Sequence, residues 1–135
     1  MNKEQLSRGI EQFNSGRYFE CHDTLEDLWH DTRGRDRLFL QGLIQISVGF
    51  HHFFNTNFKG AASQLTRGLG KLDGYRPSHL GTELELFTQE VVRWLAIAER
   101  ALQGEEPDIE RSETPKLHHV SMHHLEENKH GNDDY

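Results

Sequence analysis

The sequence predicts an all-α fold of about five helices, arranged as two related helix hairpins and a closing helix. Apolar residues recur at helical spacing in five stretches between residues 3 and 103, whereas no stretch alternates as a strand does. A shift of forty positions also lays Phe13 on Phe53 and Leu25 on Leu65. This internal similarity, which we call the forty-residue echo, favours two related helix hairpins.

The first two helices are predicted over residues 3–15 and 17–31. The first ends at the turn-forming run Asn14-Ser15-Gly16, and the second ends near Gly34. On a helix, residues three or four apart share a face, so each segment has one apolar stripe. The two stripes consist of Leu6, Ile10 and Phe13, and of Tyr18, His22, Leu25 and Trp29.

Three further helices are predicted over residues 35–56, 58–73 and 82–103. The first of these is apolar nearly all round, as a helix buried on most sides must be, and we expect it at the centre. The last opens with Thr82 and Glu85, which form a capping-box pattern. Together the five segments account for nearly all of residues 3–103.

The chain is expected to form one helical domain over residues 1–111, followed by a disordered, acidic, His-rich tail over 112–135. Its 135 residues suit a single domain. After Gly104 the composition shifts to charged residues, Pro and His, and apolar periodicity is lost. Ile109 is the exception, because we expect it to pack against the bundle. The run KLHHVSMHHLEENKH in the tail holds five of the ten histidines.

The composition excludes several classes of partner. The net charge is -7, with 15 basic and 22 acidic residues, so we expect no nucleic-acid partner and no membrane partner. Cys21 is the only cysteine, which rules out an intramolecular disulfide and suits a small buried apolar role. No stretch has the composition of a signal peptide or a membrane span. A cytoplasmic protein is expected.

The run HDTLEDLW, residues 22–29, contains the side chains best suited to bind a metal or to transfer a proton. His22 and Glu26 lie one helical turn apart, and Trp29 follows on the same side, so we expect all three to face inward. Three hypotheses remain open. The pair binds a divalent transition metal, acts as a general acid and base, or forms a buried hydrogen-bonded pair with a structural role.

The helix over residues 35–56 adds candidates to this site. In an antiparallel hairpin, Gln45 is level with His22 and Gln41 with Glu26, and both amides are good hydrogen-bond partners. His52 shares their stripe but lies two turns further along. The candidate metal ligands are His22, Glu26 and His52, and the candidate small-ligand residues are Trp29, Gln41 and Gln45.

Two resemblances bear on this motif. HDTLEDLW resembles the H-x-x-x-E-x-x-W/Y signature of the bacterial and archaeal family known as domain of unknown function 309, and FLQGLIQISVGFHH resembles the helix that follows it there. The likeness runs from about Phe13 to Leu72. It implies a small multihelical fold and a metal site at His22 and Glu26, with Trp29 completing the motif. FNSGRYFECHDTLEDL also resembles the turn and second helix of a tetratricopeptide repeat.

The resulting functional hypothesis is a helical protein of a family of unknown function, with a metal or small-ligand site between helices. A divalent metal ion is the candidate cofactor. The alternative is a tetratricopeptide-like interaction module in which the motif is purely structural. The chain has no nucleophile triad, phosphate-binding glycine loop, CxxC or HExxH motif, so no catalytic residue is predicted and enzymatic activity is left open.

Overall fold

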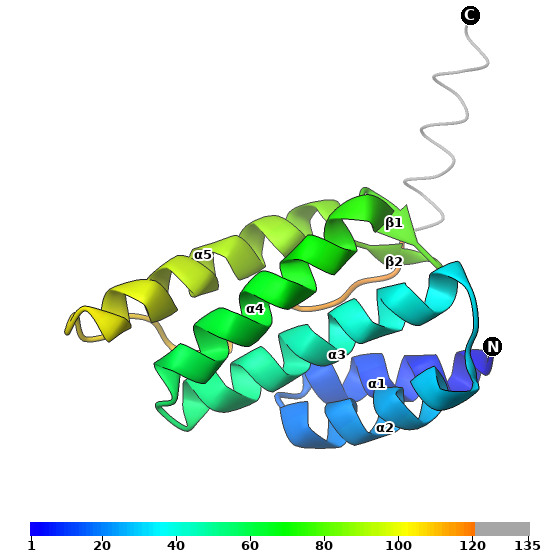
Figure 1. Cartoon of the computed structure of the whole chain (residues 1–135), viewed down its shortest axis with the longest axis horizontal. Coiled ribbons are helices and arrows are strands. Elements are labelled where there is room, and N and C mark those ends of the chain that lie inside the picture. The colour runs from blue at the N-terminus through cyan, green and yellow to red at the C-terminus, as the bar shows by residue number, and fades with distance from the viewer. Residues whose placement is uncertain (121–135) are drawn as a thin grey trace, which may run out of the picture.

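The computed structural model describes residues 1–120, and these residues form an antiparallel bundle of five α-helices (Figure 1). The all-α prediction is therefore confirmed, and each predicted helix is present within a few residues of its expected bounds. The helices are α1 (Lys3–Asn14), α2 (Tyr18–Asp31), α3 (Arg35–Phe54), α4 (Phe58–Leu72) and α5 (Glu85–Leu102).

The turns within the two hairpins are copies of each other, as the forty-residue echo predicts. After α1, the N–H of Gly16 donates to the carbonyl of Phe13 at 3.0 Å, and after α3 the N–H of Thr56 donates to the carbonyl of Phe53 at 3.0 Å. In both turns the next N–H donates, at 2.9 Å, to the carbonyl one residue further back. Gly16 and Thr56 both adopt positive φ, 76° and 58°. The turn after α3 holds a threonine in a conformation that favours glycine.

The packing inside the hairpins repeats as well. Gly9 of α1 lies against Leu25 of α2, and forty positions later Gly49 of α3 lies against Leu65 of α4. A Cβ atom added at Gly9 or Gly49 would lie 2.5 or 2.6 Å from the leucine methyl it faces. In each hairpin a helix backbone and a leucine side chain therefore touch with no room for a methyl group.

The core is an aromatic cluster that joins α1, α3 and α5. Phe50 of α3 is fully buried, and its ring centroid lies 5.9 Å from that of Phe13 and 5.5 Å from that of Trp94. Phe87 also lies within 5.7 Å of Phe13, edge to face. Such arrangements add to the free energy gained by burying the rings. The predicted central position of α3 is confirmed by its long buried face.

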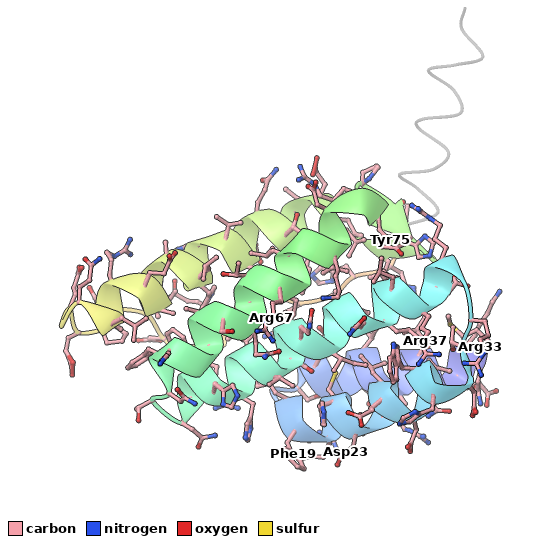
Figure 2. The ribbon with its side chains drawn as sticks, in the orientation of Figure 1. Phe19, Asp23, Arg33, Arg37, Arg67 and Tyr75 are labelled. Carbon is pink, nitrogen blue, oxygen red and sulfur yellow. The ribbon has the colours of Figure 1, made fainter. Side chains whose placement is uncertain are left out.

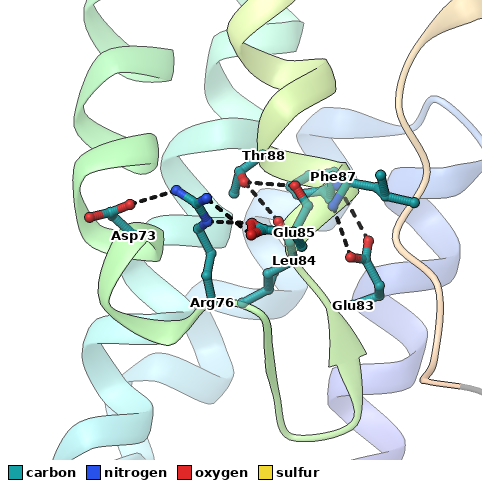
Figure 3. A network of polar contacts seen from close by, with 8 residues as sticks. Asp73, Arg76, Glu83, Leu84, Glu85, Phe87 and Thr88 are labelled. Atoms are coloured by element: carbon teal, nitrogen blue, oxygen red, sulfur yellow. Dashed lines mark hydrogen bonds and ion pairs between the residues drawn. The ribbon is translucent and has the colours of Figure 1, made fainter. Parts of the chain in front are cut away.

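The connection between α4 and α5 differs from the prediction. Thr82 does not cap α5; it lies in β2 (Thr82–Glu83), which pairs with β1 (Ser78–His79) in a short antiparallel hairpin. Helix α5 begins at Glu85, and the Glu83 carboxylate accepts from two N–H groups of its first turn at 2.8 and 3.3 Å (Figure 3). The sequence pattern indicated Thr82 as the cap of this helix, whereas Glu83 is the residue whose carboxylate stabilises its first turn.

A three-residue ion-pair network fixes this connection to the bundle. The guanidinium of Arg76 lies 2.8 Å from Asp73, at the end of α4, and 2.7 Å from Glu85, at the start of α5 (Figure 3). A hydrogen bond from Arg76 lowers the pKa of Glu85. Whatever this contact adds to stability is present at neutral pH and is lost as the pH falls through that lowered pKa.

The C-terminal segment is ordered further than the predicted domain boundary at residue 111. Residues 105–120 run back along the bundle beside α5, as the orange part of the ribbon in Figure 1 shows. Leu117 is 3% exposed and joins the core, and both its N–H and its carbonyl bond to the side chain of Asn14, at 2.7 and 2.8 Å. Ile109 packs against the core, which confirms its prediction. The rest of the predicted tail, residues 121–135, lies outside the described part.

The glycine contacts lead to a prediction about stability. Gly49→Ala is expected to destabilise the fold by about 1–3 kcal/mol, because the new methyl group must push Leu65 or the helix backbone aside. The matched control is Gly70→Ala on α4, where a Cβ would meet nothing within 4 Å. The control should gain up to about 1 kcal/mol from helix propensity. Urea denaturation measures both, and similar effects at the two positions would contradict the close packing.

Candidate functional site

His22 and Glu26 form a pair on α2, but the pair does not face inward as predicted. Nε2 of His22 lies 2.8 Å from Oε2 of Glu26, and the two side chains are 27% and 45% exposed. The buried face of α2 consists instead of Tyr18, Cys21, Leu25 and Leu28. The predicted stripe shares Tyr18 and Leu25 with this face, but it held His22 and Trp29 where the structure has Cys21 and Leu28.

The imidazole of His22 lies between two carboxylates. Its Nδ1 atom is 3.2 Å from Oδ1 of Asp23, on the side opposite Glu26. Glu26 in turn lies 3.9 Å from Nε2 of His30, one turn further along the helix. A neutral imidazole can donate to only one of its two neighbours, whereas the protonated ring can donate to both.

Trp29 closes one end of this row of side chains. It packs partly against the core, and the guanidinium of Arg37 on α3 lies 3.9 Å from the centre of its ring. Within residues 1–120 the buried Nε1 atom of Trp29 has no hydrogen-bond partner. The cation over the ring face and the packed edge together hold the indole in one orientation.

Phe19 stands at the other end, and sequence reasoning missed it. The side chain is 54% exposed, and its ring centroid lies 5.9 Å from that of His22 and 5.4 Å from that of His51 on α3. Figure 2 shows Phe19 and Asp23 projecting from the outer side of α2. The signal was available, because Phe19 lies off the apolar stripe and beside acidic residues. We name the row Phe19, His22, Asp23, Glu26 and Trp29 the α2 strip.

The glutamines predicted to face this pair do not join it. Oε1 of Gln45 accepts from Nζ of Lys71 on α4 at 2.9 Å, so its side chain lies on the other side of α3. In the described residues no hydrogen bond links Gln41 with His22 or Glu26. The expected pocket between α2 and α3 is thus not assembled, since the pair points toward solvent.

His52, the third candidate ligand, is also distant from the α2 strip. Its Nδ1 atom lies 3.4 Å from Nδ2 of Asn57, at the turn between α3 and α4. Within residues 1–120 no group of three or more His, Cys, Asp or Glu side chains is arranged to hold a metal ion. The row formed by His22, Glu26 and their neighbours Asp23 and His30 is therefore not such a group.

Comparisons with known proteins give a family for the first part of the chain. Residues 6–64 match the family model described as domain of unknown function (DUF309). This segment is a DUF309 domain. It comprises most of α1, all of α2 and α3, and the first half of α4, so it contains the whole α2 strip. The comparison with curated proteins finds no match.

The DUF309 segment ends before α5 and before the C-terminal segment that packs on it. Neither α5 nor any other helix in the described part of the chain is long and apolar enough to cross a membrane. The family description names no activity.

Cys21 lies on the buried face of the DUF309 segment and supplies a pH-dependent prediction. Burial raises the pKa of its thiol to about 12. Between about pH 9, where an ordinary thiol ionises, and about pH 12, the unfolded chain releases this proton and the folded chain keeps it. Stability is therefore expected to fall with rising pH in this window, by up to about 1.4 kcal/mol per pH unit from this group.

The test compares the parent with Cys21→Ala, because alanine occupies the equivalent, fully buried position of the second hairpin, Ala61. Urea denaturation between pH 8 and 11 should show a steeper loss of stability in the parent. Parallel curves for the two proteins would contradict the raised pKa.

Proposed function

We propose that the α2 strip is a recognition surface for a basic segment of a partner protein. The observation that carries this proposal is the exposure of Phe19, which is 54% accessible in the first turn of a helix that carries five carboxylates. Burying an exposed phenylalanine is worth about 1.5–3 kcal/mol, so a contact that covers half of it supplies roughly 1 kcal/mol. A partner with an apolar side chain gains this free energy.

The charge around Phe19 supports a basic partner. Helix α2 carries five carboxylates and no Lys or Arg, and two of the exposed ones, Asp27 and Asp31, have no ion pair within residues 1–120. The ion pair between Arg17 and Glu20 is long, at 3.8 Å. Charge complementarity of this kind speeds association and excludes acidic partners.

The other side of the bundle supports an interaction role less well. A tetratricopeptide-like groove needs an exposed apolar surface between helices, but here the chain's own C-terminal segment covers the surface of α1, α3 and α5. The guanidinium of Arg111 donates to the carbonyl of Gly16 at 2.8 Å and lies 4.3 Å from the ring centre of Phe54. The backbone of Leu117 forms two hydrogen bonds with the side chain of Asn14. Within residues 1–120 no segment covers the outer side of α2 in this way.

The proposal predicts localised binding of a basic amphipathic peptide. A helical peptide of lysine and leucine should change the NMR amide shifts of residues 19–30 and of His51, whereas the same peptide with glutamate for lysine should not. Phe19→Ala is expected to weaken binding about tenfold, a loss of about 1.4 kcal/mol, with little effect on melting because the side chain is mostly exposed.

The matched control is Leu86→Ala on α5, a substitution at another exposed apolar side chain, which is 65% accessible. It should bind the peptide as the parent does. Shift changes spread over the whole acidic surface, or equal affinities for parent and Phe19→Ala, would show that only net charge is being recognised.

A divalent metal at His22 and Glu26 is a second candidate, favoured by the 2.8 Å approach of an imidazole nitrogen and a carboxylate oxygen one turn apart. Two such groups can bind one ion together with water molecules. If they do, Zn²⁺ or Mn²⁺ should raise the melting temperature of the parent through binding to the native state.

His22→Ala and Glu26→Gln should each lose this rise, because each removes one ligand. Both variants keep the five histidines that follow residue 117, which can also chelate metal. A rise that persists in both variants would therefore belong to that segment, and the motif would have no part in it. Without metal, the free energy of unfolding of each variant should lie within about 1 kcal/mol of the parent's, because partly exposed ion pairs contribute little to stability.

A further inference from the structure

A cavity of about 570 Å³ lies at the end of the bundle away from the two hairpin turns. It is bounded by α1, by the start of α3, by the turn between β1 and β2, and by the C-terminal segment. Its volume is within the range of small-molecule sites, roughly 300–1,000 Å³. Aliphatic side chains form much of its wall, notably Leu6, Ile10 and Leu80. This site is separate from the α2 strip.

Backbone hydrogen bonds fix the walls of this cavity. The N–H of Glu83 donates to the carbonyl of His118 at 2.8 Å, and the N–H of Val120 donates to the carbonyl of Gly81 at 2.8 Å. The C-terminal segment thus pairs with β2 through a bridge between Thr82 and His119. Two segments almost forty residues apart are paired here, so the fold itself holds this part of the cavity wall in place.

One polar group on the wall is a carboxylate held in a fixed position. Oδ1 of Asp36 lies 2.8 Å from Nε2 of His79. The imidazole packs against two aromatic rings, with its centroid 4.8 Å from those of both Phe39 and Tyr75. Within residues 1–120, Oδ2 of Asp36 has no hydrogen bond, so it can accept one from a ligand.

The second polar group is the hydroxyl of Thr82. This residue lines the cavity and is 1% exposed, yet its Oγ1 atom has no hydrogen-bond partner within residues 1–120. A buried hydroxyl without a partner is unfavourable, and such groups are uncommon in folded proteins. Thr82 is paired with His79 across the hairpin, so the two side chains lie on the same face. The hydroxyl is therefore a near neighbour of the Asp36–His79 pair.

We propose that this cavity binds a small amphipathic molecule with an aliphatic body and a hydrogen-bond donor head, either a hydroxyl or an amine. The body packs on the aliphatic wall formed by Leu6, Ile10 and Leu80. The head donates to Oδ2 of Asp36, and the hydroxyl of Thr82 completes the contact. A carboxylate head is disfavoured because it would face the Asp36 carboxylate; Lys3 also lines the cavity, but it is exposed to solvent.

The test is an NMR titration of the full chain with three probes of equal length: 1-hexanol, hexylamine and hexanoate. Hexanol and hexylamine should change the amide shifts of residues 6–10 and 80–82, and hexanoate should bind at least tenfold more weakly. Absence of shift changes in these residues with hexanol and hexylamine, or equal binding of hexanoate, would overturn the proposal.

Thr82→Val tests the role of the hydroxyl, because it keeps the shape of the side chain. It should weaken hexanol binding about tenfold, the loss expected for one hydrogen bond, while the melting temperature stays the same or rises. Thr88→Val is the matched control: Thr88 is also buried, but its hydroxyl already donates to the carbonyl of Leu84 at 2.8 Å, outside the cavity. It should bind hexanol like the parent.

Ser7→Phe tests the position of the ligand independently of the hydroxyl. Ser7 lines the cavity from the exposed side of α1, so a phenyl ring there should fill the space and abolish hexanol binding without disturbing the core. Unchanged hexanol binding in both Thr82→Val and Ser7→Phe would overturn the assignment, even if the probe shifts residues nearby.

Discussion

The structure depends on the contact between a glycine and a leucine that each helix hairpin repeats. Gly9 against Leu25 and Gly49 against Leu65 leave no room for a methyl group, so they fix how closely α1 approaches α2 and α3 approaches α4. Packed interiors have few voids, and such a contact therefore also fixes the rotation of each helix about its axis. In α3 the consequence is that Phe50 points into the aromatic core, while the side chain of Gln45 reaches Lys71 on α4.

The same constraint explains why the helices could be predicted from the sequence and the candidate site could not. Apolar spacing identifies a helix even when its rotation is uncertain by one position, because Tyr18 and Leu25 belong to both possible faces of α2. The choice between Cys21 and His22 as the inward neighbour depends on what α1 and α3 present to α2. That information lies in tertiary packing and not in local periodicity. The pair of His22 and Glu26 was therefore recognised as a pair but assigned to the wrong side.

The extended parts of the chain were missed for a different reason. The segment that carries Leu117 has no repeating pattern, since it is held by one asparagine side chain and a few single contacts. The short hairpin that carries Thr82 is likewise too brief to show alternation. Both elements contribute to the cavity at the end of the bundle. The α2 strip lies within the DUF309 segment, whereas the cavity combines that segment with residues beyond it.

The pair of hydrogen bonds between Asn14 and Leu117 also bears on the order in which the chain folds during synthesis. The two residues are 103 positions apart, so the bond cannot form until nearly the whole described chain has left the ribosome. The first hairpin is complete long before that, with its inner surface uncovered. Local helix pairs form quickly, whereas contacts between distant residues close slowly. The C-terminal segment therefore closes a bundle whose other helices are already paired, and until then the surface that Leu117 covers is exposed to solvent.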